Sequence, residues 1–92
     1  MNTKAKLYVI AYDIEENSTR IKVANALKSF GERVQRSVFE CWLTPSELEE
    51  LKQRLKKLIN SENDSIRIYT PCGQVQILGF GEPTSAPSFY IA

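Results

Sequence analysis

An aspartate that directly follows an apolar run is the residue of this chain with the clearest capacity for chemistry. Residues Tyr8 to Asp13 read YVIAYD, so the run ends in a carboxylate. An ionised carboxylate beside a buried strand needs water, a hydrogen-bonding partner or a cation. Asp13 therefore either faces solvent at the end of a strand, caps the backbone of the loop that follows, or binds a metal ion.

The metal-binding interpretation of Asp13 requires a second copy of the chain. Mg²⁺ usually takes one or two carboxylates together with waters and substrate phosphates. In a homodimer whose twofold axis passes near Asp13, two carboxylates would face each other, and they would repel unless a cation lay between them. A divalent ion there could polarise a phosphodiester and activate water. We therefore predict Mg²⁺, or another divalent cation such as Mn²⁺, at Asp13, with Glu15 and Glu16 as auxiliaries or as solvated loop charges.

Side chains suited to nucleic acid come near Asp13 in the expected topology. The four cations are Arg20, Lys22, Arg33 and Arg36. The arginine guanidinium binds a phosphate through two parallel N–H groups, so the group predicts contacts with RNA or DNA, although each cation alone could be an ordinary surface charge. Two aromatic residues of the same region, Tyr12 and Phe39, belong either to the core or to a surface on which bases stack.

The composition excludes several kinds of active site. The 92 residues contain no histidine, which removes a histidine general base, a Ser-His triad and a histidine-ligated metal. Two cysteines, Cys41 and Cys72, cannot form a zinc site alone and are expected to pack as small apolar side chains. The net charge of +1 is too small for the overall charge of the chain to indicate nucleic-acid binding, so any basic surface must be local.

The hydropathy pattern indicates a cytoplasmic protein with no membrane partner. No stretch approaches the ~20 apolar residues of a spanning helix. The apolar run after Lys4 and Lys6 is too short for a signal peptide and lacks a small-residue cleavage site.

The first third of the chain predicts a central strand and a helix. Residues Lys6 to Ile14 are expected to form a strand. Both alternating sets between Leu7 and Tyr12 are apolar, which is typical of a strand covered on both faces. Asn17 or Ser18 is expected to cap the following helix, and Gly31 to end it in a left-handed conformation. The apolar positions of this helix recur at helical spacing and are Ile21, Val23, Ala24, Leu27 and Phe30.

The remaining two thirds predict a hairpin, a second helix and two more strands. The segment from Arg33 to Leu43 is too long for one strand, and the strand is expected to break around Gln35 to Ser37. The TPSE segment from Thr44 to Glu47 forms a capping box with proline at the first helical position. Two further strands are expected over residues Ser65 to Thr70 and Val75 to Leu78.

This order of elements predicts an α+β fold of the ferredoxin-like kind. A βαββαβ unit with an extra C-terminal strand forms an antiparallel sheet with two helices on one face. We expect one domain over residues 1–81 and a tail over residues 82–92, whose terminal apolar residues dock on a sheet edge. The second face of the sheet also carries apolar residues, and a second copy of the chain could cover it.

The chain resembles a known family in several segments taken together. YDI, Arg20, GERVQRSVFECWL, TPSELEEL and DSIRIY are similar, in order and spacing over residues 7–81, to the small CRISPR-associated adaptation nuclease. This family accompanies the integrase subunit in spacer acquisition. The resemblance implies a ferredoxin-like homodimer with magnesium held by the strand-one aspartate of each protomer, here Asp13. It also implies cleavage of RNA or DNA in some members and, in others, a dimer that serves only as a scaffold for the integrase.

The same resemblance implies roles for individual residues. The positions that match nucleic-acid or active-site residues of the family are Tyr12, Arg20, Lys22, Arg33 and Phe39. Arg36 stands where an aromatic residue is common in the family, and Trp42 where a small or polar residue is usual. Four functions stay open at this point: a metal-dependent endonuclease, a non-catalytic adaptor that binds DNA, a toxin-like ribonuclease, and a small-molecule sensor with the same fold.

Overall fold

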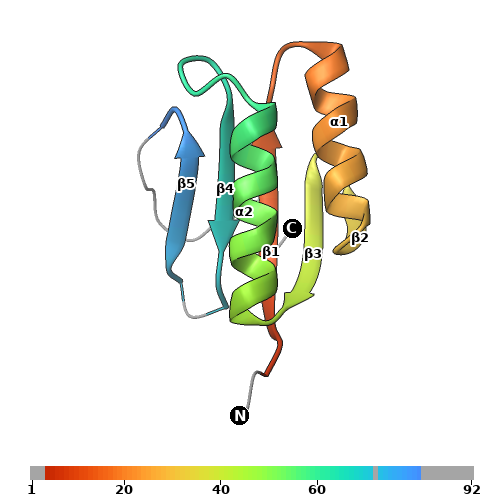
Figure 1. Ribbon diagram of the computed structural model, residues 1–92, viewed down its shortest axis with the longest axis vertical. Coiled ribbons are helices and arrows are strands. Elements are labelled where there is room, and N and C mark those ends of the chain that lie inside the picture. The colour runs from red at the N-terminus through yellow and green to blue at the C-terminus, as the bar shows by residue number, and fades with distance from the viewer. Residues whose placement is uncertain (1–3, 72, 82–92) are drawn as a thin grey trace.

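The computed structural model describes residues 4–71 and 73–81 and confirms the predicted α+β fold (Figure 1). Five antiparallel strands form one sheet in the order β2-β3-β1-β4-β5. The strands are β1 (Lys6–Asp13), β2 (Gly31–Gln35), β3 (Val38–Leu43), β4 (Ser65–Tyr69) and β5 (Val75–Gly79), and the helices are α1 (Asn17–Lys28) and α2 (Pro45–Leu58). The predicted tail over residues 82–92 lies outside the described residues.

Strand β1 occupies the centre of the sheet, as its two apolar sets predict. It pairs with β3 on one side and with β4 on the other, so Ile10 lies between Phe39 and Ile68. Successive side chains alternate between the two faces. Tyr12 therefore faces the helices, whereas Asp13 shares the opposite face with Val9 and Ala11.

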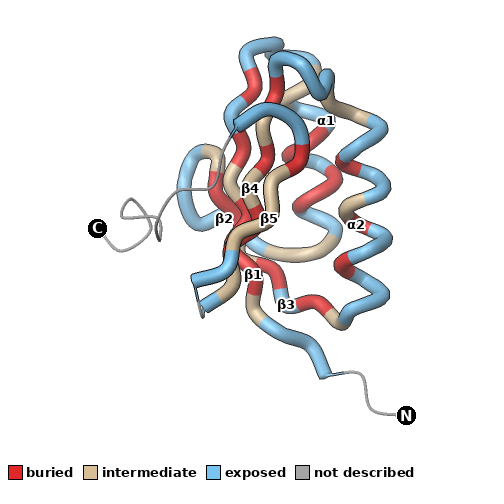
Figure 2. Tube along the Cα trace, turned by 90° about the vertical axis from the view of Figure 1, so that its left-hand side faces the viewer, coloured by how far each residue is buried: buried red, intermediate tan, exposed pale blue. Residues whose placement is uncertain are grey.

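Both helices cover the same face of the sheet (Figure 2), and the main core lies between helices and sheet. Helix α1 packs over β2 and β3, and α2 contacts β3 and β5. The fully buried members include Ile10, Leu27, Phe39, Leu51 and Ile68. In the part of the chain that is described, neither helix is both long and apolar enough to span a bilayer.

Helix α2 begins as its sequence predicts. The Thr44 side chain accepts a hydrogen bond from the Glu47 backbone N–H at 3.3 Å, and the Glu47 carboxylate accepts one from the Thr44 N–H at 2.8 Å. Pro45 occupies the first turn, where its missing N–H costs no hydrogen bond. The capping box fixes the start of α2 directly after β3.

Helix α1 departs from its sequence prediction at its start and along its apolar stripe. Glu16, rather than Asn17 or Ser18, is the N-cap residue, and its carboxylate accepts a hydrogen bond from the Thr19 hydroxyl at 2.6 Å. Ile21 was expected to pack in the core, but it is 52% exposed. Helical spacing alone therefore assigned one residue too many to the buried stripe.

Gly31 does not form the left-handed helix end that was predicted for it. Among the described glycines, positive φ values occur at Gly73, Gly79 and Gly81. Gly31 is the first residue of β2, and a Cβ atom there would collide with the carbonyl oxygen of Glu40 on β3 and with Cys41 Sγ at 2.5 Å. Glycine is required here by close contact between strands rather than by backbone conformation.

The helix-free face of the sheet carries a smaller apolar cluster. Val9, Val38 and Tyr69 are buried there, with Ala11 and Val75 packed against them. Trp42 pairs with Leu7 on the same face and is 66% exposed. This face thus presents apolar surface to solvent around a buried centre, as the sequence predicted.

Burial of Cys41 predicts a measurable dependence of stability on alkaline pH. Burial raises the pKa of the Cys41 thiol from 9.0 to about 11. The unfolded thiol ionises first, so stability that is fully present below about pH 9 is lost as the pH rises toward 11. Two pKa units correspond to about 2.7 kcal/mol of unfolding free energy.

Urea unfolding between pH 7 and pH 11 tests this contribution. We expect Cys41→Ala to be less stable than the parent at pH 7, because it leaves a cavity, but to lose less stability between pH 9 and pH 11. Ser46→Ala, at an exposed position of α2, serves as the control and should follow the parent. Parallel profiles for the parent and Cys41→Ala would contradict the assignment.

Candidate metal and nucleic-acid site

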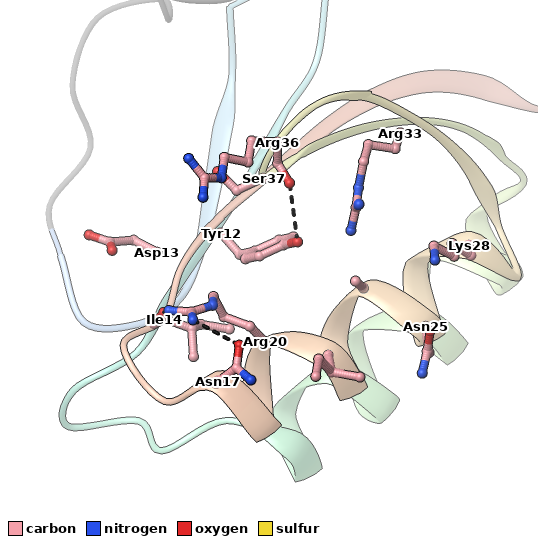
Figure 3. A pocket seen from close by; sticks show the side chains of 12 residues that line it. Tyr12, Asp13, Ile14, Asn17, Arg20, Asn25, Lys28, Arg33, Arg36 and Ser37 are labelled. Atoms are coloured by element: carbon pink, nitrogen blue, oxygen red, sulfur yellow. Dashed lines mark hydrogen bonds between the residues drawn. The ribbon is translucent and has the colours of Figure 1, made fainter.

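A cleft of about 610 Å³ opens at the end of β1, between α1 and the turn that joins β2 to β3 (Figure 3). Among the described residues, its lining contains a single acid and four cations, which are Asp13, Arg20, Lys28, Arg33 and Arg36. A chain with a net charge of only +1 therefore concentrates positive charge in one hollow. Such a local excess of cations favours a polyanionic ligand.

Asp13 lies at the rim of this cleft and is exposed. It is opposite Ser65 of β4, and it also borders a second hollow of about 460 Å³ on the helix-free face. No hydrogen bond or ion pair to its carboxylate is found within residues 4–71 and 73–81. The carboxylate is thus available to a ligand from either hollow.

A second aspartate, Asp64, has a structural role and provides a comparison for Asp13. Asp64 is 6% exposed and accepts a hydrogen bond from the Asn60 backbone N–H at 2.8 Å. Its backbone carbonyl accepts another from the Phe80 N–H at 2.8 Å. Asp64 therefore closes the loop between α2 and β4, whereas Asp13 has no comparable task.

Arg20 holds the loop that connects Asp13 to α1. Its Nη1 donates to the carbonyl oxygens of Ile14 at 3.0 Å and Glu15 at 2.9 Å, and its Nη2 donates to Asn17 Oδ1 at 3.0 Å. Arginine carries five N–H donors in a fixed plane, and this loop uses three of them. Arg20 lines the cleft as predicted, and it also braces the backbone immediately after Asp13.

The turn between β2 and β3 forms the opposite wall of the cleft. The predicted break falls at Arg36 and Ser37, and the Ser37 carbonyl accepts a hydrogen bond from the Tyr12 N–H at 3.0 Å. The Tyr12 hydroxyl lies 3.5 Å from the Arg36 carbonyl oxygen, at the long limit of a hydrogen bond. Tyr12 thus ties the turn to β1, and Arg36 lies on the same side of the cleft as Asp13 (Figure 3).

Phe39 acts on this site only through a neighbour. The side chain was predicted to contact nucleic acid, but it is fully buried (0% exposed), so no base can stack on it. The Arg33 guanidinium lies over the Phe39 ring at 5.3 Å from the centroid, which is a cation–π arrangement. Phe39 therefore supports Arg33 from below.

Helix α1 separates the predicted cations into two groups. Arg20 faces the cleft, whereas Lys22 lines a different hollow between α1 and α2. Two polar residues that were not predicted from the sequence, Asn25 and Lys28, also line the cleft. The signal was present in the spacing, since the lining residues of α1 follow the i, i+3, i+4 pattern of one helix face and are Asn17, Arg20, Ile21, Ala24, Asn25 and Lys28.

Among the described residues, the cleft offers one carboxylate, that of Asp13, as a possible metal ligand. Across the residues that the structure places, no group of three or more histidine, cysteine, aspartate or glutamate side chains is arranged to hold a metal ion. Asp13 meets the oxygen-ligand preference of Mg²⁺, but further ligands would have to come from water, from a substrate phosphate or from another copy of the chain.

The sequence profile of the family described as CRISPR associated protein Cas2 matches residues 6–76. The chain belongs to the Cas2 family. The matched segment contains every element from β1 to α2. It also contains Asp13 and the other residues that line the cleft.

Curated Cas2 relatives carry nuclease names. A protein of Thermus thermophilus, named CRISPR-associated endonuclease Cas2 2, is 51% identical over 83% of this chain and 84% of its own length. A Synechocystis protein, named CRISPR-associated endoribonuclease Cas2 3, is 49% identical over 84% of this chain and 86% of its own length.

Solved structures of similar proteins share the fold. A crystal structure of a Thermus thermophilus protein, described as hypothetical, superposes with a TM-score of 0.72 at 49% identity and covers 88% of this chain and 98% of its own. The Cas2 of Streptococcus pyogenes superposes with a TM-score of 0.66 at 37% identity, over 68% of this chain and 82% of its own. These two solved structures therefore share the fold of this chain over the residues that superpose.

Replacing Arg20 tests its bracing role in this Cas2 chain. We expect Arg20→Gln to lower the free energy of unfolding by about 1–2 kcal/mol, because two backbone carbonyls and Asn17 lose a charged donor. Lys22→Gln, two residues further along the same helix, should change it by less than about 0.5 kcal/mol. Thermal or urea unfolding provides the measurement, and equal losses for the two variants would count against the brace.

Proposed function

We propose that the chain is a homodimeric, metal-dependent endonuclease that hydrolyses phosphodiester bonds of RNA or DNA in CRISPR adaptation, and that its dimer also serves as a scaffold for the spacer integrase. One observation carries the nuclease proposal: the exposed carboxylate of Asp13 stands at the rim of a cleft whose other charged residues, within the part of the chain that the structure describes, are all cations. The nuclease names of the curated relatives agree with it.

Asp13 of each protomer would hold the divalent ion. Mg²⁺ or Mn²⁺ would polarise the scissile phosphate and lower the pKa of a bound water. The absence of histidine from the chain gives this proposal weight, because no histidine can act as general base. The chemistry of the donor set fits, since a carboxylate oxygen is the ligand type that these hard cations take.

The cations of the cleft would bind the nucleic acid that the ion acts on. Arg36 lines the same two hollows as Asp13 and can offer a bidentate contact to a phosphate. Hydrogen bonds to the loop occupy three of the five N–H donors of the Arg20 side chain. Two N–H donors are therefore left for a phosphate. By bracing the segment after Asp13, Arg20 would also limit how far the carboxylate moves away from the phosphate.

In the proposed dimer, the Asp13 of the second protomer would approach through the helix-free face of the sheet. This face bears an apolar cluster around Val9 and the exposed Trp42, and apolar surface of this kind favours association. Asp13 belongs to the same face by its register in β1. A twofold contact through this face could therefore bring two carboxylates together while the helices stay outside.

A second function, a scaffold without catalysis, is favoured by the sparse metal site. One carboxylate from the described part of each chain is few for a dedicated metal centre, whereas the cations alone suffice to bind a nucleic-acid backbone. In this alternative the dimer holds duplex DNA for the integrase and Asp13 has no role in the reaction.

Replacing Asp13 separates the two functions. We expect Asp13→Asn to reduce Mg²⁺-dependent cleavage of RNA or DNA more than about 100-fold, because the variant loses a ligand charge, and loss of even an outer-shell partner costs 10–100-fold. The same variant should bind Mn²⁺ more weakly in calorimetry. Glu62→Gln, an exposed acid in the loop after α2, provides the matched control and should cleave as the parent does.

Spacer integration in cells completes that experiment. If the parent cleaves nothing with either ion, and Asp13→Asn supports integration at the parental rate, the scaffold function stands and the nuclease proposal is wrong. If cleavage by Asp13→Asn equals that of the parent, Asp13 is not the metal ligand.

A charge placed on the helix-free face tests the dimer. We expect Ala11→Glu to shift the protein from dimer to monomer in light scattering and to abolish cleavage together with Mn²⁺ binding, because the paired Asp13 would be lost. Gln53→Glu, on the exposed side of α2, should stay dimeric and active. A folded Ala11→Glu monomer, verified by circular dichroism, that still cleaves would refute sharing of the ion between two copies.

A further inference from the structure

The hollow on the helix-free face of the sheet holds a cation that the cleft does not contain. Arg67 of β4 lines this hollow of about 460 Å³ together with Asp13, but it does not line the cleft beside α1. In the register of β1 against β4, Arg67 is opposite Ala11, and Asp13 is opposite Ser65. Arg67 is therefore diagonal to Asp13 on the same face, and such positions are about 7–8 Å apart, within reach of a long side chain.

The guanidinium of Arg67 lies at the end of β4 that is paired with Asp13. A Cβ atom at Gly81 would be 2.8 Å from Arg67 Nη2 and 3.6 Å from Ser65 Oγ, so the guanidinium and the Ser65 side chain lie close to the same point. Glycine at position 81 allows the chain to pass this close to the guanidinium. The Arg67 side chain is half-buried and thus already partly removed from water.

A second copy of the chain on the helix-free face would remove Arg67 from water still further. Its neighbours across the sheet are Ala11 of β1 and Ile77 of β5, and Ala11 packs against the apolar cluster of this face. A desolvated cation without an anionic partner is strongly unfavourable. The same contact would bring two Asp13 carboxylates together, and they would repel. Each of these charges therefore supplies what the other lacks.

We propose that the Arg67 guanidinium of each protomer pairs with the Asp13 carboxylate of the other, so that the dimer forms with both carboxylates neutralised before any divalent ion binds. This inference rests on the proposed function for the dimer and its face, and it adds a positioning residue that holds Asp13 at the interface. Within one chain the pair is not formed, because no ion pair to the Asp13 carboxylate is found among the residues that the structure describes.

Two other charged residues of this region fit the pairing less well. Arg36 lines the same hollow, but it belongs to the exposed turn between β2 and β3 and also lines the cleft, so it stays accessible when the helix-free face is covered. Glu40 shares the helix-free face, opposite Val9, but it does not line the hollow that contains Arg67. Both residues serve as comparisons in the test.

Analytical ultracentrifugation of the full chain in EDTA measures the pairing without reference to nuclease activity. We expect Arg67→Gln to weaken dimerisation about 30-fold or more, because removal of one partner leaves the other charge buried and unpaired. Arg67→Lys keeps the charge and should restore most of the affinity. Lys56→Gln, which removes a cation that lines a different hollow, should dimerise as the parent does.

A double variant gives the sharper outcome. With the carboxylate charge also removed, Asp13→Asn combined with Arg67→Gln should dimerise about 10-fold more tightly than Arg67→Gln alone. A merely structural role of Arg67 would leave the double variant at least as weak as the single one. Mn²⁺ should likewise restore dimerisation of Arg67→Gln, since a divalent ion can neutralise the two carboxylates. Circular dichroism and urea unfolding establish that each variant is folded.

Three results would overturn the pairing. The first is dimerisation of Arg67→Gln with the affinity of Lys56→Gln. The second is recovery of Arg67→Gln by Glu40→Gln but not by Asp13→Asn, which would make Glu40 the partner. The third is a parent that dimerises only with Mn²⁺, because the ion rather than Arg67 would then neutralise the carboxylates, and the proposed dimer would stand without the pairing.

The remaining outcomes separate the pairing from the proposed function. If Arg36→Gln weakens the dimer as much as Arg67→Gln does, the pairing is not specific to Arg67 and is wrong as stated. If Ala11→Glu leaves the dimer intact, the helix-free face is not the interface and both proposals fail. If the double variant recovers as expected but the parent cleaves nothing with Mg²⁺, the nuclease proposal fails and the pairing stands.

Discussion

Strand β1 is hydrogen-bonded on both sides and apolar on both faces, and the arrangement of the site depends on that constraint. Its register against β3 and β4 puts Tyr12 on the helix face and Asp13 on the other. A shift of one residue would reverse the two faces, burying Asp13 under α1 and exposing Ile10. The carboxylate is therefore held at the end of the sheet by the packing of the whole strand.

The elements next to β1 then determine what surrounds that carboxylate. The chain turns out of β1 into α1 over three residues, and Arg20 fixes this passage through the carbonyls of Ile14 and Glu15. The β2–β3 turn returns to the same end because Tyr12 binds its backbone. Two short connections thus bring cations from separate segments to one place, although the chain as a whole is nearly neutral.

The sequence predicted those features that depend on local chemistry. The capping box at Thr44 and the doubly apolar β1 were readable from neighbouring residues, and the hairpin break at Arg36 followed from the length of the segment from Arg33 to Leu43. It failed at Gly31, which is required by the carbonyl of Glu40 across the sheet, and it left Phe39 open between the core and a stacking surface, whereas the structure buries this side chain. Lys28 was missed for a different reason, since its charge at the end of a helix is explained equally well by the helix dipole.

The position of Asp13 between two hollows resolves a conflict between its two proposed tasks. A metal ion shared across a twofold axis needs the carboxylate to face a second protomer, whereas a substrate strand needs it to face open solvent. The cleft on the helix side carries the cations, and the hollow on the helix-free side is bordered by the apolar cluster. Because Asp13 borders both, a partner could cover one side without closing the other. An aspartate in the middle of β1 would face only one side of the sheet. The position of Asp13 at the end of the strand is therefore what allows it to meet both a second protomer and a substrate strand.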